Sequence, residues 1–176
     1  MIMAIRNIVQ DGDPILKKKC RPVTDFNEKL GTVLDDMAET MMKANGLGLA
    51  APQIGMMRRF FIVLDQYYDE EDNVINDIYE MINPEILTKE GENTNFEGCL
   101  SFPGRNGLIT RPQRITVRAQ DRNGEWFEME AEGLLARAIC HENDHLDGIT
   151  VLDNADVFYE DLTEEEREEL VLDDYD

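Results

Sequence analysis

One short stretch, HENDH at residues 141–145, constrains the fold more than any other part of the sequence. It holds His141 and His145, the two histidines of a chain of 176 residues. Four residues make slightly more than one turn of an α-helix, so both imidazoles point to one side if the stretch is helical. Apolar residues continue the same stripe toward the start of such a helix. The sequence therefore predicts a helix over about residues 133–147 with both histidines on one face.

Glu142, directly after the first histidine, completes a His-Glu-x-x-His arrangement. Its spacing suits two metal ligands and one general base acting on a water between them. A bare match to this short pattern occurs by chance in many proteins. Here the two histidines lie on an otherwise apolar face, where unpaired imidazoles are costly to bury. The pattern therefore favours a metal site over a chance occurrence.

A catalytic metal site needs a third protein ligand and an open position for water. Cys99 is the candidate we favour, because Gly98 beside it lets the backbone approach a partner closely. Cys140 adjoins His141 but points about 100° away on a helix, so we interpret it as a small buried residue. Cys20 receives the same interpretation.

A glutamate about twenty residues beyond the second histidine is the alternative third ligand, as in some zinc proteases. Glu164, Glu165 and Glu166 fall in that window. They lie in an acid-rich tail, where any window would contain a glutamate, so this agreement carries little weight.

Composition limits the class of protein and its partners. The length fits a single domain, and the formal net charge of −21 disfavours nucleic acid and anionic membrane surfaces as partners. Three cysteines give no disulfide framework and suit a reducing compartment. No apolar run is long enough to cross a bilayer, and the N-terminal residues lack signal or transit character. We expect a cytoplasmic protein.

The remaining pattern mixes helix and strand. Helical spacing of apolar residues predicts a helix over residues 27–44, with Asp25 and Glu28 as a capping box. Its methionines, Met37, Met41 and Met42, are interpreted as core residues. Strand patterns occupy residues 58–65, 81–87 and the two runs that flank the turn at 121–124, where Ile115, Val117 and Ala119 share one face.

Two segments carry weaker signals. Residues 66–79 are polar and predict an exposed loop or a loose hairpin. Residues 153–176 contain 12 acidic residues and one arginine, which predicts a solvated helix or frayed tail. With no linker visible, we expect residues 1–152 to form the catalytic domain and residues 153–176 to belong to the same single domain.

Three motifs in order identify a family resemblance: GLGLAAPQ at 46–53, EGCLS at 97–101 and HENDH at 141–145. Each is modest alone, but together they are specific. Over about residues 5–152 the chain resembles the peptide deformylases. The resemblance implies an α+β fold, in which antiparallel or mixed sheets surround a central helix that carries the histidines.

The resemblance also implies an activity. Members of the family are metal-dependent hydrolases that remove the N-formyl group from the first methionine of newly made peptides and release formate. It implies Fe(II) held by Cys99, His141 and His145, with Zn(II), Ni(II) or Co(II) as substitutes. Glu142 would take the proton of the attacking water and later deliver it to the leaving amine.

The resemblance assigns two donors and a pocket. The side-chain amide of Gln53 and the backbone N–H of Leu100 would stabilise the oxyanion. The candidate substrate-binding residues are Leu47, Gly48, Leu134 and Ala138. Gly48 would let an extended substrate pair with the backbone, and the other three would form the wall of a methionine pocket.

Two departures from the family pattern touch no ligand: Cys140 stands where Gln is frequent, and Leu134 where Phe is frequent. The acidic tail makes docking on ribosomal RNA doubtful. Besides the deformylase hypothesis, two others stay open at this point. One is a zinc peptidase that uses a tail glutamate; the other is a metal-holding relic without activity.

Overall fold

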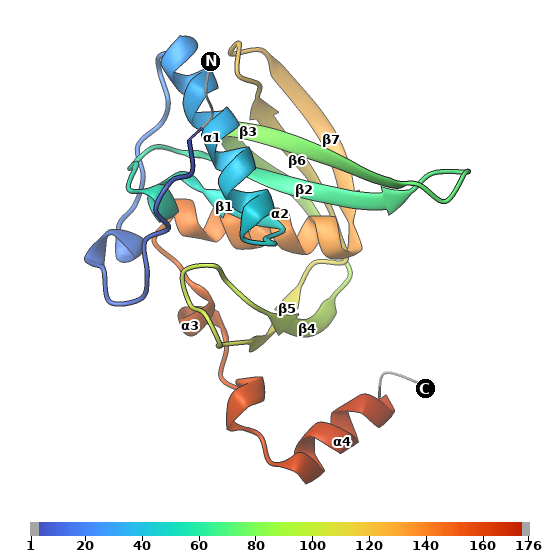
Figure 1. Ribbon diagram of the computed structural model, residues 1–176. Coiled ribbons are helices and arrows are strands. Elements are labelled where there is room, and N and C mark those ends of the chain that lie inside the picture. Colours follow the sequence, from blue (N-terminus) through green and yellow to red (C-terminus); the bar gives the residue numbers. More distant parts are fainter. Residues whose placement is uncertain (1–3, 174–176) are drawn as a thin grey trace.

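A computed structural model describes residues 4–173 of the chain (Figure 1). Its strands form a five-stranded antiparallel sheet in the order β1-β2-β3-β6-β7 and a separate two-stranded sheet, β4-β5. The long helix α2 lies between the two sheets (Figure 1). The α+β class with a central helix, expected from the sequence, is confirmed. The strands are β1 (Gly48–Ala50), β2 (Phe60–Tyr68), β3 (Val74–Glu90), β4 (Asn93–Glu97), β5 (Gly107–Arg111), β6 (Arg114–Gln120) and β7 (Trp126–Glu132).

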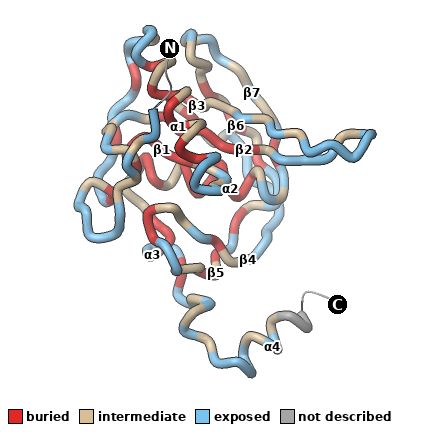
Figure 2. Tube along the Cα trace, in the orientation of Figure 1, coloured by how far each residue is buried: buried red, intermediate tan, exposed pale blue. Residues whose placement is uncertain are grey.

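Strand β2 is the centre of the fold, since its first five residues are buried on both faces. Residues Phe60 and Ile62 face helix α1 (Glu28–Lys43), whereas Phe61 and Val63 face helix α2 (Gly133–Leu146). A strand covered on both sides must be apolar throughout, which explains the unbroken run FFIVL. Figure 2 shows the buried residues gathered in this part of the molecule.

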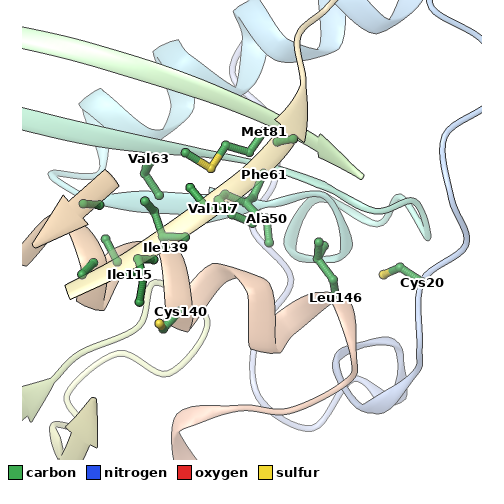
Figure 3. Close-up of a cluster of buried hydrophobic side chains, with 14 residues drawn as sticks. Cys20, Ala50, Phe61, Val63, Met81, Ile115, Val117, Ile139, Cys140 and Leu146 are labelled. Atoms are coloured by element: carbon green, nitrogen blue, oxygen red, sulfur yellow. The ribbon is translucent and has the colours of Figure 1, made fainter. Parts of the chain in front are cut away.

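The cluster between the sheet and α2 fixes the position of the histidine-bearing helix. Ile115, Val117 and Ala119 of β6 share one face, as the sequence predicted, and all three have zero exposure. They pack with Ile139 and Cys140 of α2, as Figure 3 shows for four of these side chains. The interpretation of Cys140 and Cys20 as buried residues is confirmed, since 5% and 4% of their surfaces are exposed.

The N-cap of helix α1 lies two residues after the predicted one. Asn27, not Asp25, is the N-cap, and its side chain accepts a hydrogen bond from the backbone N–H of Leu30 at 3.1 Å. The capping box was therefore wrong: Asn27 stands directly before the first helical residue, where its side-chain oxygen reaches a free backbone N–H. Met37 and Met41 are fully buried, but Met42 is 38% exposed, because it lies off the stripe that faces β2.

Residues 66–79, predicted as a loop or loose hairpin, belong to a regular hairpin of β2 and β3. Backbone pairing continues without interruption from Phe60 opposite Ile82 to Tyr68 opposite Val74. The hairpin tip projects well beyond the body of the molecule (Figure 1). The turn between β6 and β7 also lies where the sequence predicted it.

Beyond α2 the chain forms short elements that run along the β4-β5 sheet and then leave it. These are α3 (Val151–Asn154), η3 (Tyr159–Asp161) and α4 (Glu164–Asp173), while η1 (Pro14–Lys17) and η2 (Ala51–Ile54) lie near the N-terminus and after β1. The tail is thus partly the solvated helix that its composition predicted. Within the described residues, every helix is too short or too polar to span a bilayer.

Candidate metal centre

The structure brings Cys99, His141 and His145 together. Their ligand atoms all lie within 4.8 Å of one another, and Cys99 Sγ is 3.4 Å from His145 Nε2. A tetrahedral ion bound to sulfur and nitrogen at ordinary lengths separates those two atoms by about 3.6 Å. The three side chains therefore fit a shared metal ion, with one thiolate, two imidazoles and room for a fourth ligand.

Helix α2 supplies the two imidazoles, and burial fixes their directions. His141 and His145 are 8% and 1% exposed, and their rings meet edge to face with centroids 5.0 Å apart. Burial and the nearby His141 lower the pKa of His145 to about 3, which keeps its imidazole neutral. A neutral imidazole is the form that binds metals.

Glu97, at the end of β4, orients the first imidazole. Its carboxylate lies 2.9 Å from His141 Nδ1, so the other ring nitrogen, Nε2, is the one that faces Cys99 and could bind a metal. Burial opposes the charge of Glu97, but hydrogen bonds from His141 and Arg111 lower its pKa to about 2. Arg137 of α2 donates a further hydrogen bond to the same carboxylate at 2.6 Å.

The pKa of His141 responds to the same neighbours. Burial lowers it, yet hydrogen bonds with Cys99 and Glu97 raise it well above its ordinary value. A proton on this ring would compete with a metal ion for the same nitrogen, so binding of a metal there would release a proton.

The loop that follows β4 positions Cys99. Gln53 lies beneath it, 1% exposed, and its amide nitrogen donates to Ser101 Oγ at 3.1 Å and lies 3.6 Å from Cys99 Sγ. The other end of the amide accepts the Ala50 N–H at 2.9 Å, which fixes the orientation of the side chain. Gln53 thus joins the loop that carries the thiolate to strand β1.

Glu142 is the carboxylate beside the three ligand atoms. Its Oε1 lies 4.0 Å from His141 Nε2, and only 4% of its surface is exposed. Burial raises the pKa of Glu142 to about 7. Its Oε2 is buried and has no hydrogen-bond partner among the described residues, so this oxygen retains its capacity to accept a proton. A carboxylate with a pKa near neutrality suits a general base.

Gly48 explains how Glu142 is accommodated. A Cβ at position 48 would stand 2.5 Å from Glu142 Oε1 and 2.7 Å from its Cγ. Any side chain there would displace the carboxylate. The sequence assigned Gly48 to substrate binding, and contact with Glu142 is a second reason for glycine that sequence reasoning missed.

A cavity of about 360 Å³ opens beside the ligand cluster. All four candidate substrate-binding residues, Leu47, Gly48, Leu134 and Ala138, line it, together with Leu100. Leu134 lines the cavity and is 62% exposed. Gln53 is not among the lining residues and reaches the site from below Cys99.

Sequence reasoning missed several lining residues. Phe96, Arg105, Asn106 and Arg137 also border the cavity. Two of them adjoin predicted motifs, since Phe96 precedes EGCLS and Arg137 lies one helical turn before His141. Only their proximity to a motif could have identified these residues from the sequence, because none of their side chains has chemistry that by itself indicates a binding site.

The tail glutamates do not join the cluster. Glu164, Glu165 and Glu166 are exposed on α4, and Glu166 accepts hydrogen bonds from the backbone and hydroxyl of Thr163. Within the described residues, the group of side chains able to hold a metal is Cys99, His141 and His145. This arrangement disfavours the zinc peptidase hypothesis.

Comparison with known proteins agrees with this geometry. The sequence model of the family described as Polypeptide deformylase matches residues 5–160. The chain is 48% identical over 152 residues to "Peptide deformylase 1" of Clostridium perfringens, covering 86% of this chain and 99% of the relative. It is 46% identical over 168 residues to "Peptide deformylase" of Thermoanaerobacter pseudethanolicus, covering 96% and 98%.

Solved structures give the same result. The chain matches the crystal structure of peptide deformylase from Thermotoga maritima with a TM-score of 0.76 and 40% identity, covering 87% of this chain and 99% of that one. It matches a Met-Ala-Ser bound class I type b peptide deformylase from Acinetobacter baumannii with a TM-score of 0.79 and 31% identity, over the same shares of the two chains.

Proposed function

The chain belongs to the polypeptide deformylase family, and from this premise we propose the part that each residue of the site takes in the reaction. The protein is a metal-dependent hydrolase that removes the N-formyl group from the N-terminal methionine of newly made peptides and releases formate. What supports the residue assignment is one observation: a cysteine sulfur and two imidazoles converge beside the buried carboxyl group of Glu142.

Cys99, His141 and His145 would hold the metal, and we propose Fe(II) as the ion, with Zn(II), Ni(II) or Co(II) as substitutes. One thiolate and two imidazoles accept each of these ions, so availability decides among them. When bound, the ion would act as a Lewis acid and make a water more acidic. Glu97 would keep the His141 ring in the orientation that presents Nε2.

Glu142 would carry the proton. It accepts one proton from the water as that water adds to the formyl carbon. It then returns the proton to the peptide nitrogen as the carbon–nitrogen bond breaks, so the free amine leaves. The formic acid gives up its remaining proton to the solvent and departs as formate. A pKa of about 7 lets the same carboxyl accept and release a proton near neutral pH.

Gln53 and Leu100 would stabilise the oxyanion that forms on the formyl oxygen. The amide nitrogen of Gln53 donates to Ser101 and toward Cys99 Sγ, so its second N–H is directed at the ligand cluster, where the oxyanion would form. Preorganised donors of this kind are worth about 3 to 4 kcal/mol each when removed. Leu47, Leu134 and Ala138 would contact the methionine side chain, and Gly48 would let the peptide backbone approach.

The reaction indicates the substrate and the cellular compartment in which the enzyme acts. Because formylated chains leave ribosomes, we propose that the enzyme acts in the cytoplasm on nascent peptides. Its charge of −21 disfavours direct binding to nucleic acid and docking on ribosomal RNA through the acidic tail. We also propose that residues 1–152 are the catalytic part and that residues 153–176 belong to the same domain.

The test is formate release from formyl-Met-Ala-Ser by protein prepared without oxygen and loaded with Fe(II) or Ni(II). We expect turnover by the wild type and a loss of roughly 100- to 10,000-fold in kcat for Glu142→Ala, with metal content unchanged. Absence of formate release from folded, metal-loaded wild type would refute the proposal. Equal kcat in the variant would refute the part given to Glu142.

A further inference from the structure

Three residues that line the cavity have no part in the proposed chemistry: Phe96, Arg105 and Asn106. We call these three residues the outer wall. Each of the three contacts a segment that follows α3. We call residues 157–161 the C-terminal strap. The strap includes η3 and lies between the β4-β5 sheet and α4.

Backbone pairing attaches the strap to β5. The Leu108 N–H donates to the Val157 carbonyl at 2.8 Å, and the Tyr159 N–H donates to the Asn106 carbonyl at 2.9 Å. Between them, Phe158 forms an antiparallel bridge with Gly107. The strap therefore extends the small sheet by a short third strand at the open edge of β5.

Side chains of the strap then hold each residue of the outer wall. Tyr159 packs edge to face on Phe96, with ring centroids 5.5 Å apart and an interplanar angle of 83°. Asp161 accepts two hydrogen bonds from Arg105, both at 3.1 Å. Glu160 accepts from the backbone N–H and the side-chain amide of Asn106, at 3.0 and 2.6 Å.

Helix α4 supports the strap from the other side. The Arg167 guanidinium lies over the Tyr159 ring, 4.7 Å from its centroid. Arg167 also donates to the backbone carbonyls of Tyr159 and Glu160, at 3.2 and 3.3 Å. The single arginine of the acidic tail thus fixes the residue that packs on Phe96, and Phe96 lines the cavity.

We propose that the C-terminal strap, through Tyr159, is a positioning element that sets how tightly the peptide is held in the cavity. This inference rests on the proposed function. Phe96 has a free side toward the cavity and a side covered by Tyr159, so removing the Tyr159 ring frees Phe96 to change rotamer. The wall residues neither hold metal nor carry protons in the proposed mechanism, so the effect falls on KM and leaves kcat unchanged.

The experiment compares Tyr159→Ala with wild type in steady-state hydrolysis of formyl-Met-Ala-Ser. Loss of an aromatic edge-to-face contact corresponds to a rise in KM of roughly three- to tenfold. We expect kcat to stay within about twofold. Tyr159→Phe keeps the ring and restores the wild-type KM. Tyr68→Ala, which removes a tyrosine that is 71% exposed on the distant hairpin, is the matched control and leaves KM unchanged.

Arg167→Ala is the second variant, and it raises KM in the same direction by removing the support behind Tyr159. A KM equal to wild type in both variants overturns the proposal, and so does a fall in kcat with KM unchanged. Calorimetric binding of the tripeptide Met-Ala-Ser needs no turnover, so it tests the strap even if formate release fails. Weaker binding by Tyr159→Ala supports the strap, and equal binding refutes it.

Discussion

Gly48→Ala tests the arrangement of the general base most directly. The added methyl would meet three atoms of Glu142 at 2.5, 2.7 and 2.8 Å. Carbon contacts are comfortable at about 3.5 Å or more, so the carboxylate has to move by about 1 Å. Gly48 does not have a left-handed backbone conformation, so alanine introduces no backbone strain and its effect is steric.

A displacement of this size has a known order of magnitude. Misplacing a catalytic group by about 1 Å costs roughly 100-fold in rate, or about 2.7 kcal/mol in the activation free energy. Glu142 is only 4% exposed and borders the cavity, so a carboxylate pushed away from the methyl also changes its position relative to the three ligand atoms. We therefore expect kcat for formate release to fall about 100-fold. Metal content should not change, because the three atoms nearest the new methyl all belong to Glu142 and none is a metal ligand.

The assay measures kcat, KM and bound metal for wild type and Gly48→Ala. Gly31→Ala is the matched control: a Cβ there meets its nearest atom at 3.6 Å, an ordinary contact, and Gly31 lies in α1. A kcat within about threefold of wild type, with a rise in KM alone, would refute the reasoning. It would show that the methyl obstructs the peptide and leaves the base in place.

Three further predictions concern the metal, the core and acid stability. Glu97→Gln removes the charge that orients His141, so metal affinity measured against a competing chelator should fall roughly 10- to 100-fold; unchanged affinity would contradict this role. Leu34→Ala, at a fully buried position of α1, should lower the free energy of unfolding in urea by about 2 to 5 kcal/mol, and a loss below 1 kcal/mol would indicate a loose core. Asp36 accepts the Ala4 N–H at 2.8 Å and pairs with Arg6, contacts that hold its pKa below the ordinary 3.8. The stability that the ionised Asp36 carboxylate gives to the fold is therefore fully present above pH 3.8. It disappears as the pH falls through the lower pKa of the folded state. The stability difference between wild type and Asp36→Asn should shrink in that acid range, and a constant difference would contradict the assignment.

Local periodicity explains which parts of the fold the sequence predicted. The stripe that contains His141 and His145 repeats every turn, so neighbouring residues alone determine the helix and the face it presents. The same holds for the alternation of Ile115 and Val117 in β6. The cap of α1 was misplaced because Asp25 and Asn27 are both good caps. Which of the two residues becomes the N-cap depends on where the preceding chain enters the helix.

Contacts between distant residues explain what the sequence did not predict. Glu97 is 44 positions from His141, and its carboxylate also meets Arg111 and Arg137. Each charge is stable in the interior only because the others are present, a condition that no single segment reveals. The contact of Gly48 with Glu142 has the same origin, since β1 and α2 approach only after the sheet has formed.

The net charge of the acidic tail does not predict which of its residues make specific contacts. Its composition predicted solvation, and α4 is indeed exposed at five of the seven positions, 164–170, whose burial the structure describes. The preceding strap nevertheless packs, because β5 offers unpaired backbone groups at its edge, and such an edge is stabilised by a further strand. Once the backbone is paired, Glu160 and Asp161 stand opposite Asn106 and Arg105, so two of the acidic residues bind the wall of the cavity. The function of a charged segment therefore depends on its backbone pairing, which net charge does not describe.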